Sequence, residues 1–259
     1  MNQQLEQAQQ FHQLHQQAHP LILVNAWDVG SAQTIQESGA QAIATGSWSV
    51  AHAHGYEDGE QLPFELVLAN VQRICKHSDV PVTIDIEGGY GQTPEQIQHN
   101  VIQIIQCGAV GINIEDRLPA GDGLYSIQQQ QARLRAAREA ADKVSIPLFI
   151  NARTDIFFQA AVETHDHTHL EAAIQRAHAY AEAGAHGIFV PGLCDEQLIR
   201  ELCQQSPIPV NIMFSATMPS ISTLTACGVA RISYGPHPYL QLMDTLKQCS
   251  IRALAGQFF

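Results

Sequence analysis

Short apolar runs alternate with longer amphipathic segments along most of this 259-residue chain. Eight of these runs are rich in Val, Ile, Leu and Ala and have the length of buried strands, and a helix-compatible segment separates each from the next. Eight β-α units in a chain of this length predict a (β/α)8 TIM barrel. The runs are residues 21–24, 42–45, 82–86, 110–116, 147–155, 187–191, 210–213 and 230–233.

One extra helix is expected before the first strand, because apolar residues recur at helical spacing in the Gln-rich stretch 3–17 and Pro20 ends it. We therefore expect a single domain over residues 1–259, with a leading helix within 1–19 and a C-terminal helix over 238–254. An open doubly wound sheet is the rival fold. Gly88-Gly-Tyr-Gly91 does not match the G-x-G-x-x-G fingerprint that such a sheet usually carries.

Two connections have a recognisable local pattern. Residues 46–58 are expected to form a long loop after the second strand, and a connection of this length suggests function. Thr93 followed by Pro94 is typical of a helix that begins with a capping hydroxyl and a proline in its first turn.

Composition limits the classes of function. A formal net charge of −12 repels nucleic acid and anionic membranes, so an anionic substrate needs a local patch of metal, arginine or backbone amides. No apolar run reaches the roughly 18 residues of a membrane span, and the polar N-terminus is unlike a signal peptide. We expect a cytoplasmic protein whose six cysteines, with no C-x-x-C pair, are reduced thiols.

Acidic residues stand where two neighbouring strands are expected to end. Asp85 and Glu87 follow the third run and Glu115 closes the fourth, so all three lie at the carboxyl end of the barrel, where TIM-barrel active sites form. Three carboxylates favour Mg²⁺, with Mn²⁺ as the alternative metal, over zinc. The alternative for Asp85 is that it caps the next helix or pairs with a basic neighbour.

Arg153 ends the fifth run and is expected beside these acids, where its guanidinium can bind a carboxylate through two hydrogen bonds. A structural salt bridge to Asp155 or Glu115 is the alternative. The other polar residues expected around the same cavity are Asn25, Asp28, Ser47, Trp48, Asp116, Asn151 and Asn211.

Six short motifs follow the strands in order, and together they resemble the isocitrate lyase and phosphoenolpyruvate mutase superfamily from about Leu21 to Ser233. This resemblance implies a magnesium-dependent barrel that makes or breaks a carbon–carbon or carbon–phosphorus bond next to a 2-oxo acid through an enolate-like species. The motifs are Asn25-Ala-Trp-Asp28, Thr45-Gly-Ser-Trp-Ser49, Gly55-Tyr-Glu-Asp58, Asp85-Ile-Glu-Gly-Gly-Tyr-Gly91, Gly111-Ile-Asn-Ile-Glu-Asp116 and Asn151-Ala-Arg-Thr-Asp155.

The resemblance also implies roles for single residues. Asp85 matches the acid that coordinates magnesium most directly, and Glu87 and Glu115 match acids that hold its water shell, although the best-known members have Asp where Glu87 stands. The carboxylate-binding arginine is Arg153. The remaining matches are Gly46, Ser47 and Trp48 as the segment that binds substrate oxyanions and Asp58 as an acid of the second loop, with Asn211 taken as a further substrate-binding residue.

The loop after the fourth strand departs from the family. Isocitrate and methylisocitrate lyases carry a Lys-Cys-Gly-His type segment there, and phosphoenolpyruvate mutases place a lysine and an asparagine in it. Here residues 117–126 contain no lysine, cysteine, histidine or asparagine. Asp122, Tyr125 or His237 is left as the proton donor, and the sequence does not choose among them.

Three functions follow from these observations. The first is a magnesium-dependent lyase that cleaves a carbon–carbon bond in a small 2-oxo or 2-hydroxy carboxylate. The second is a phosphoenolpyruvate or phosphonopyruvate mutase, and the third is a barrel that binds carboxylates without catalysis. The resemblance also implies dimers, paired into tetramers, that exchange their last helix, and residues 238–254 carry a wide apolar set consistent with this.

Two further patterns are weaker candidates. His165-Asp-His-Thr-His169 has spacing that suits a metal, but a solvated polar loop is the favoured interpretation. Cys194 follows the sixth run, where a packed thiol is favoured over a catalytic one.

Overall fold

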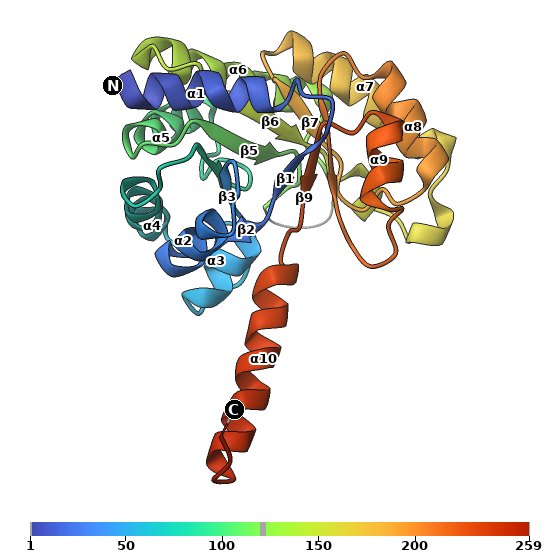
Figure 1. Ribbon diagram of the computed structural model, residues 1–259. Coiled ribbons are helices and arrows are strands. Elements are labelled where there is room, and N and C mark those ends of the chain that lie inside the picture. Colours follow the sequence, from blue (N-terminus) through green and yellow to red (C-terminus); the bar gives the residue numbers. More distant parts are fainter. Residues whose placement is uncertain (1, 120–122, 259) are drawn as a thin grey trace.

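In the computed structural model, which describes residues 2–119 and 123–258, parallel strands form a barrel surrounded by helices (Figure 1). The sheet order is β1-β9-β8-β7-β6-β5-β4-β3-β2, and each pairing is parallel. The predicted TIM barrel is therefore confirmed. The strands are β1 (Leu21–Leu23), β2 (Asn25–Ala26), β3 (Ile43–Thr45), β4 (Val82–Asp85), β5 (Gly111–Glu115), β6 (Phe149–Arg153), β7 (Gly187–Phe189), β8 (Val210–Met213) and β9 (Arg231–Ser233).

The barrel closes through its first segment. β1 pairs with β9, whereas β2, which begins after Val24, pairs with β3. Strands in a barrel are tilted and staggered, so a single segment pairs with one neighbour in its first half and with the other neighbour in its second half. The predicted strand over residues 21–24 is thus β1, and a second short strand, β2, follows directly after this range and completes the closure of the sheet.

Helices follow the strands as the sequence pattern predicts, with one correction. Residues 46–58 are not all loop, because α3 forms at their start and buries Ser49, Val50 and Ala51. Thr93 caps α5 as expected, and Gln96 completes a reciprocal capping box with it. The helices are α1 (Asn2–Leu14), α2 (Val29–Glu37), α3 (Ser47–Ala53), α4 (Phe64–Lys76), α5 (Pro94–Gln106), α6 (Ile127–Val144), α7 (His167–Glu182), α8 (Glu196–Gln205), α9 (Ile221–Cys227) and α10 (His237–Leu254).

The extra helix α1 closes the amino end of the barrel. Phe11 is fully buried and packs edge to face on Phe149, the first residue of β6. A Cβ atom on Gly111, the first residue of β5, would lie 2.8 Å from the Phe11 ring, so only glycine leaves room for this contact. The opposite end of the barrel is left for the polar residues at the strand ends.

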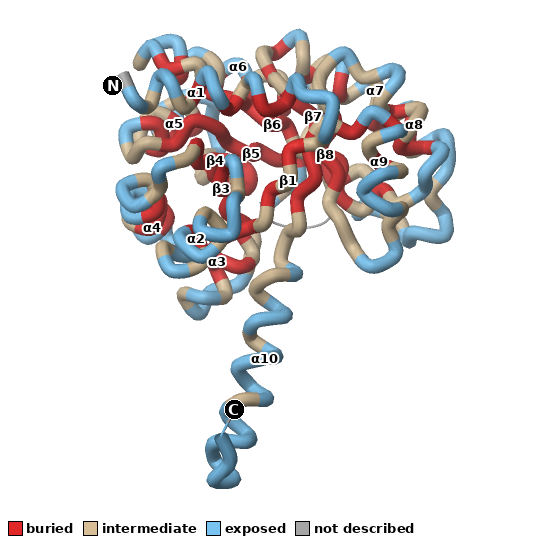
Figure 2. Tube along the Cα trace, viewed as in Figure 1, coloured by how far each residue is buried: buried red, intermediate tan, exposed pale blue. Residues whose placement is uncertain are grey.

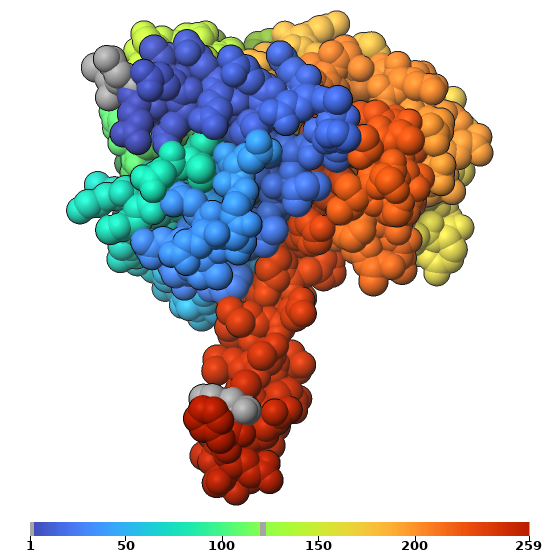
Figure 3. Space-filling model, in the orientation of Figure 1, coloured from blue at the N-terminus to red at the C-terminus, as the bar shows by residue number. Residues whose placement is uncertain are grey.

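The last helix, α10, has a different surrounding from the other helices. It projects away from the barrel (Figures 1 and 3), and it contains no buried residue (Figure 2). Leu240, Leu242, Leu246 and Ile251 are each between 45% and 57% exposed. None of the helices in the described part of the chain has the length and hydropathy needed to cross a membrane.

Candidate active site

A cavity of about 240 Å³ opens at the carboxyl end of the barrel. Asp85 is the last residue of β4 and Arg153 the last residue of β6, and both line this cavity. Predicted residues from five segments therefore meet as the strand ends indicate. The predicted residues that line the cavity are Asn25, Gly46, Ser47, Trp48, Asp58, Asp85 and Arg153.

Asp85 is the carboxylate at the centre of this arrangement. Its Oδ2 accepts hydrogen bonds from the backbone N–H and the hydroxyl of Ser47 at 3.5 and 3.3 Å, and its Oδ1 accepts one from the backbone N–H of Glu87. Burial raises the pKa of Asp85, the Arg153 charge opposes this rise, and the nearby Asp58 carboxylate adds to it. The Oδ1 atom of Asp58 is buried and has no hydrogen-bond partner among the described residues. The Asp85 carboxylate and the unpartnered Asp58 Oδ1 at one cavity fit a hard cation.

Arg153 is held from both sides by acids. Its Nη1 lies 2.8 Å from Oε2 of Glu115, and its Nε and Nη2 donate to the two oxygens of Asp155 at 2.6 and 2.8 Å. Burial alone lowers the pKa of Arg153, but the two carboxylates outweigh it and hold the pKa well above its usual value. Both ion pairs that sequence reasoning gave as alternatives are formed. Two N–H groups of the five in a guanidinium remain for another ligand.

Glu115 does not line the main cavity. It lies beside it, in a second hollow of about 380 Å³ bounded by Trp48, Asp58 and Arg117. Burial raises its pKa well above the usual value, and Arg153 opposes this rise. Glu115 therefore contacts the site mainly through its ion pair with Arg153.

Glu87 is turned toward the connection that follows α3. Its Oε2 accepts hydrogen bonds from the backbone N–H groups of Gly59 and Glu60 at 2.7 and 2.6 Å, and its Oε1 accepts one from the Tyr90 hydroxyl at 2.8 Å. Burial, with the neighbouring Asp58 carboxylate, raises its pKa to about 7. Glu60, Glu87 and Tyr90 all have positive φ angles, a backbone conformation that concentrates at functional sites.

The three predicted metal acids thus have different positions. Only Asp85 lines the main cavity, and in the described parts of the chain no three His, Cys, Asp or Glu side chains are grouped closely enough to hold a metal ion. A metal with one direct protein ligand and several waters is the arrangement that Mg²⁺ usually adopts. The donor set fits that arrangement and does not fit a closed metal cage.

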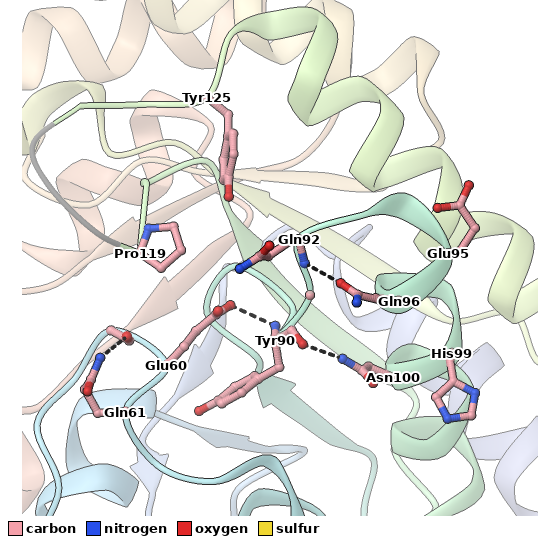
Figure 4. Close-up of a pocket in the computed structure, with 12 residues that line it drawn as sticks. Glu60, Gln61, Tyr90, Gln92, Glu95, Gln96, His99, Asn100, Pro119 and Tyr125 are labelled. Carbon is pink, nitrogen blue, oxygen red and sulfur yellow. Dashed lines mark hydrogen bonds between the residues drawn. The ribbon is translucent and has the colours of Figure 1, made fainter.

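A larger groove of about 960 Å³ lies on the outer side of residues 59–61. Figure 4 shows Glu60, Tyr90 and Gln92 in it, with Tyr125 at its edge, and neither Asp85 nor Arg153 lines it. The Tyr125 ring lies 4.2 Å from the Arg133 guanidinium. The groove is an open polar surface, so size alone does not identify the active site.

Neither of the two described proton-donor candidates lines the Asp85 cavity. Tyr125 lines the other groove, and His237 is exposed at the first residue of α10. Asp122 lies outside the described residues. The position of Tyr125 or His237 therefore gives no support to either as the general acid or base.

Several predicted rim residues have structural partners instead. Asp28 caps α2 by accepting a hydrogen bond from the Ser31 backbone N–H at 2.7 Å. Asp116 is fully buried and forms an ion pair with Arg176 at 2.8 Å, away from the cavity, while it also accepts a hydrogen bond from Tyr180. The strand pattern placed both acids near the barrel mouth but did not show which way each side chain turns.

Of the three asparagines predicted at the cavity, one lines it and two do not. Asn25 lines the cavity, but its amide links Thr45 to the backbone of Gly235, which joins the two edges of the barrel. Asn151 and Asn211 are buried inside the barrel and do not line the cavity. Asn211 as a substrate-binding residue therefore has no support from its position.

Asn113 and Arg117 are among the residues that line the cavity but that sequence reasoning missed. Asn113 lies two positions before Glu115 on β5, and side chains two apart in a strand share a face, so the spacing held this signal. Arg117 is exposed in the loop after β5 and carries no comparable signal.

The weaker candidates have ordinary contacts. His165 Nε2 lies 2.8 Å from the Phe157 carbonyl oxygen, and His169 pairs with Asp166, which caps α7. Cys194 donates to the Gly192 carbonyl oxygen and does not line the cavity. Residues 167–169 thus begin α7 rather than a solvated loop, and Cys194 has the contact of a packed thiol.

An α/β barrel with a carboxylate and an arginine at its carboxyl end has the arrangement of a TIM-barrel enzyme site. The model of the phosphoenolpyruvate phosphomutase family matches residues 11–254. The chain therefore belongs to this family, within the superfamily that also contains isocitrate lyase, and it is an enzyme of the lyase or mutase type.

Several relatives cover most of the chain. A provisionally named phosphonomutase from Burkholderia cenocepacia J2315 is 48% identical, with a TM-score of 0.94 over 96% of this chain and 99% of that one. An uncharacterized protein of Mycobacterium tuberculosis (strain H37Rv) is 35% identical over 88% of this chain and 83% of its own length. The 2-methylisocitrate lyase of Escherichia coli K12 is 31% identical over 79% of this chain and 69% of its own length.

A more distant structure shares the fold. Phosphonopyruvate hydrolase in complex with oxalate and Mg²⁺ is 19% identical, with a TM-score of 0.84 over 97% of this chain and 88% of that one.

Proposed function

We propose that this protein is a Mg²⁺-dependent lyase that cleaves a carbon–carbon bond next to a 2-oxo or 2-hydroxy carboxylate through an enolate-like intermediate. The observation that carries the proposal is the position of Asp85. Its carboxylate lies in the cavity, accepts a hydrogen bond from Ser47, and shares the cavity lining with Arg153. The 31% identical 2-methylisocitrate lyase supports this reaction class.

Asp85 would hold the metal directly, and Glu87 and Glu115 would act through water molecules. The bound cation would neutralise negative charge on the substrate oxygens as an enolate develops. The hydrogen bonds that fix both Glu87 oxygens explain why it would act at a distance. The distantly related hydrolase structure with Mg²⁺ and oxalate supports this choice of metal.

Arg153 would orient the substrate carboxylate. Its contacts with Glu115 and Asp155 lock the guanidinium in one orientation, so little side-chain entropy is lost when its two free N–H groups bind a ligand. Ser47 and Trp48 would bind oxygens on the other side of the cavity. Asp58, whose Oδ1 has no partner among the described residues, is the remaining acid that can accept a proton or bind a water.

The second candidate is a carbon–phosphorus bond reaction on phosphonopyruvate or phosphoenolpyruvate. The 48% identity to the provisionally named phosphonomutase favours it. The described part of the loop after β5, residues 117–119 and 123–126, contains no lysine or asparagine of the kind that the mutases use. We therefore place the lyase first.

A substrate panel separates these functions. Oxaloacetate, methylisocitrate, dimethylmalate, phosphonopyruvate and phosphoenolpyruvate are each incubated with enzyme and Mg²⁺, and proton and phosphorus NMR record the products. Cleavage of a carbon–carbon bond supports the lyase, and a changed phosphorus signal supports the second candidate. Binding without turnover of any compound would leave only the non-catalytic barrel.

We also propose that α10 packs on a partner subunit. The outer side of β1 has an apolar groove beside α2, lined by Ile22, Val24, Ile35 and Ala40, while the apolar residues of α10 are exposed. An α10 helix from a second copy would cover both surfaces at once. This supports the exchanged-helix dimer that the family resemblance implies, with tetramers as pairs of such dimers.

A further inference from the structure

Arg231 of β9 is enclosed in the interior of the barrel, beneath the Asp85 cavity. It is 1% exposed and is among the largest fully buried side chains of the described residues. Its Nε and Nη1 atoms have no hydrogen-bond partner in the described structure. Burial lowers its pKa to about 9, and the charge of Asp85 acts in the opposite direction. Burying a cation with so few partners costs free energy of folding, so Arg231 is expected to have a role beyond packing.

The one hydrogen bond that Arg231 forms in the described structure goes to Asn113. Arg231 Nη2 donates to Oδ1 of Asn113 at 3.2 Å, and Asn151 Nδ2 donates to the same oxygen at 2.9 Å. A guanidinium has donors only, so the Asn113 atom that faces it must be the oxygen. The amide of Asn113 therefore has a single orientation.

This orientation determines what Asn113 presents to the cavity that it lines. Its Oδ1 is occupied by two donors on the barrel side, so the atom that is left for a ligand is Nδ2. Asn113 pairs in register with Asp85 across the β4–β5 ladder, so the two side chains lie side by side on the inner face of the barrel. A donor thus lies next to the proposed metal ligand.

His15 lies on the opposite side of Arg231 and does not share its charge. Its ring stacks on Phe149, 3.9 Å between centroids, and its Nδ1 lies 2.8 Å from the Phe11 carbonyl oxygen. Burial, with the positive charge of Arg231, lowers the pKa of His15 to about 3. Arg231 is therefore the charged group of this part of the interior, and its charge acts on Asp85 as well as on His15.

We propose that Asn113 is a substrate-binding residue that donates an Nδ2 hydrogen bond to a carboxylate or enolate oxygen at the cavity floor, and that Arg231 is the positioning residue that fixes its amide. This inference rests on the proposed function, since the ligand is a small 2-oxo acid. The donor would bind an anionic oxygen beside Asp85. It would disfavour a ligand that places an N–H or O–H group there.

Calorimetric titration of oxalate in the presence of Mg²⁺ tests this role. Asn113→Ala removes one hydrogen bond to a charged ligand and is expected to weaken oxalate binding by about 10-fold, and Asn113→Asp by about 100-fold, because it places an acceptor where the donor was. Asn100→Asp makes the same chemical change in the other groove and should keep the parental affinity. Thermal unfolding confirms that each variant is folded.

A double-mutant cycle tests the part of Arg231. Arg231→Met alone is expected to weaken oxalate binding by about 10-fold, and in the Asn113→Ala background it should cost little more, because Arg231 acts through Asn113. Fully additive losses would show a general structural effect and overturn the positioning role. If Arg231→Met does not fold, Arg231→Lys, which keeps the charge but loses the planar donor, takes its place in the cycle.

The outcomes distinguish the two proposals. If the parent binds oxalate with Mg²⁺ and both Asn113 variants bind it equally well, the role of Asn113 is overturned and the proposed function stands. If the parent binds neither oxalate nor any compound of the substrate panel, both proposals fail together.

Discussion

The guanidinium of Arg153 donates two hydrogen bonds to the carboxylate of Asp155, with nitrogen–oxygen distances of 2.6 and 2.8 Å. Asp155 is completely buried, so replacing it by Asn leaves a buried cation with one acid fewer. We expect Asp155→Asn to lower the free energy of unfolding by about 3–5 kcal/mol, the usual cost of breaking a buried ion pair. Urea unfolding measures this change.

Asp142→Asn is the matched control for that variant. Asp142 forms an ion pair with Arg138 at 3.0 Å, but 67% of its side chain is exposed. Its loss should therefore cost less than about 1 kcal/mol. Equal destabilisation by the two variants would contradict the structural importance of the Arg153–Asp155 pair.

The composition of the loop after β5 predicts that the protein cleaves isocitrate only slowly. The loop residues 117–126 contain no cysteine or histidine, so the acid–base group of isocitrate lyases is missing. Loss of such a group typically slows a reaction by about 100-fold to 10,000-fold. Glyoxylate release from isocitrate should therefore be below 1% of the rate of a lyase that has the motif. Rapid glyoxylate release would mean that another side chain supplies the proton.

Two histidines at the amino end of the barrel, one buried and one half-buried, predict a dependence of stability on pH. Burial lowers the pKa of His15 to about 3 and that of His186 to about 4, from 6.5. Between these values and pH 6.5 the unfolded chain binds more protons than the folded chain. The free energy of unfolding that these histidines contribute is therefore lost as the pH falls through this window. Acids with raised pKa values, such as Glu87, act in the opposite direction.

Comparison with variants isolates the histidine contribution. We expect His15→Gln to flatten the plot of unfolding free energy against pH between 4 and 6 by up to about 1.4 kcal/mol per pH unit, the slope that one proton produces. His19→Gln changes an exposed histidine and should leave the slope unchanged. A parental slope in His15→Gln would show that His15 does not titrate in this way.

The exposed apolar face of α10 predicts the assembly state. Light scattering after size exclusion should show a dimer or tetramer, whereas Leu246→Glu should shift the chain toward a monomer, because Leu246 is 57% exposed on an otherwise uncovered helix. Lys247→Glu places the same charge at the adjacent position and should keep the assembly. A clean parental monomer of 28.4 kDa at micromolar concentration rules out the exchanged-helix dimer.

Periodicity was sufficient to predict the barrel and most of its elements. Each apolar run contributes to the sheet, because burial on both faces of a parallel strand leaves a continuous hydrophobic signal. Helix α3 was missed because its residues, Ser47–Ala53, combine two tryptophan-flanking serines and a histidine with few strong helix formers. Its formation depends on packing of Val50 and Ala51 against the rest of the barrel.

For the candidate site, the sequence was sufficient to predict which residue types lie at the strand ends. Asp85 and Arg153 are the last residues of their strands, so chain position places them at the cavity. The direction of Glu87 depends on a positive φ of 50°, and that of Asp116 depends on a distant arginine, Arg176. Contacts between residues far apart in the sequence set these directions, and no local pattern reports them.

The most direct test of the account is a calorimetric titration of Mg²⁺ into the parent protein and into Asp85→Ala. The parent should bind Mg²⁺, and Asp85→Ala should lose binding, because Asp85 is the only predicted metal acid that lines the main cavity of the described structure. Asp244→Asn, a change of charge on the exposed helix α10, serves as the control and should bind like the parent. Binding by Asp85→Ala with parental affinity would contradict the proposed magnesium site and the lyase chemistry that depends on it.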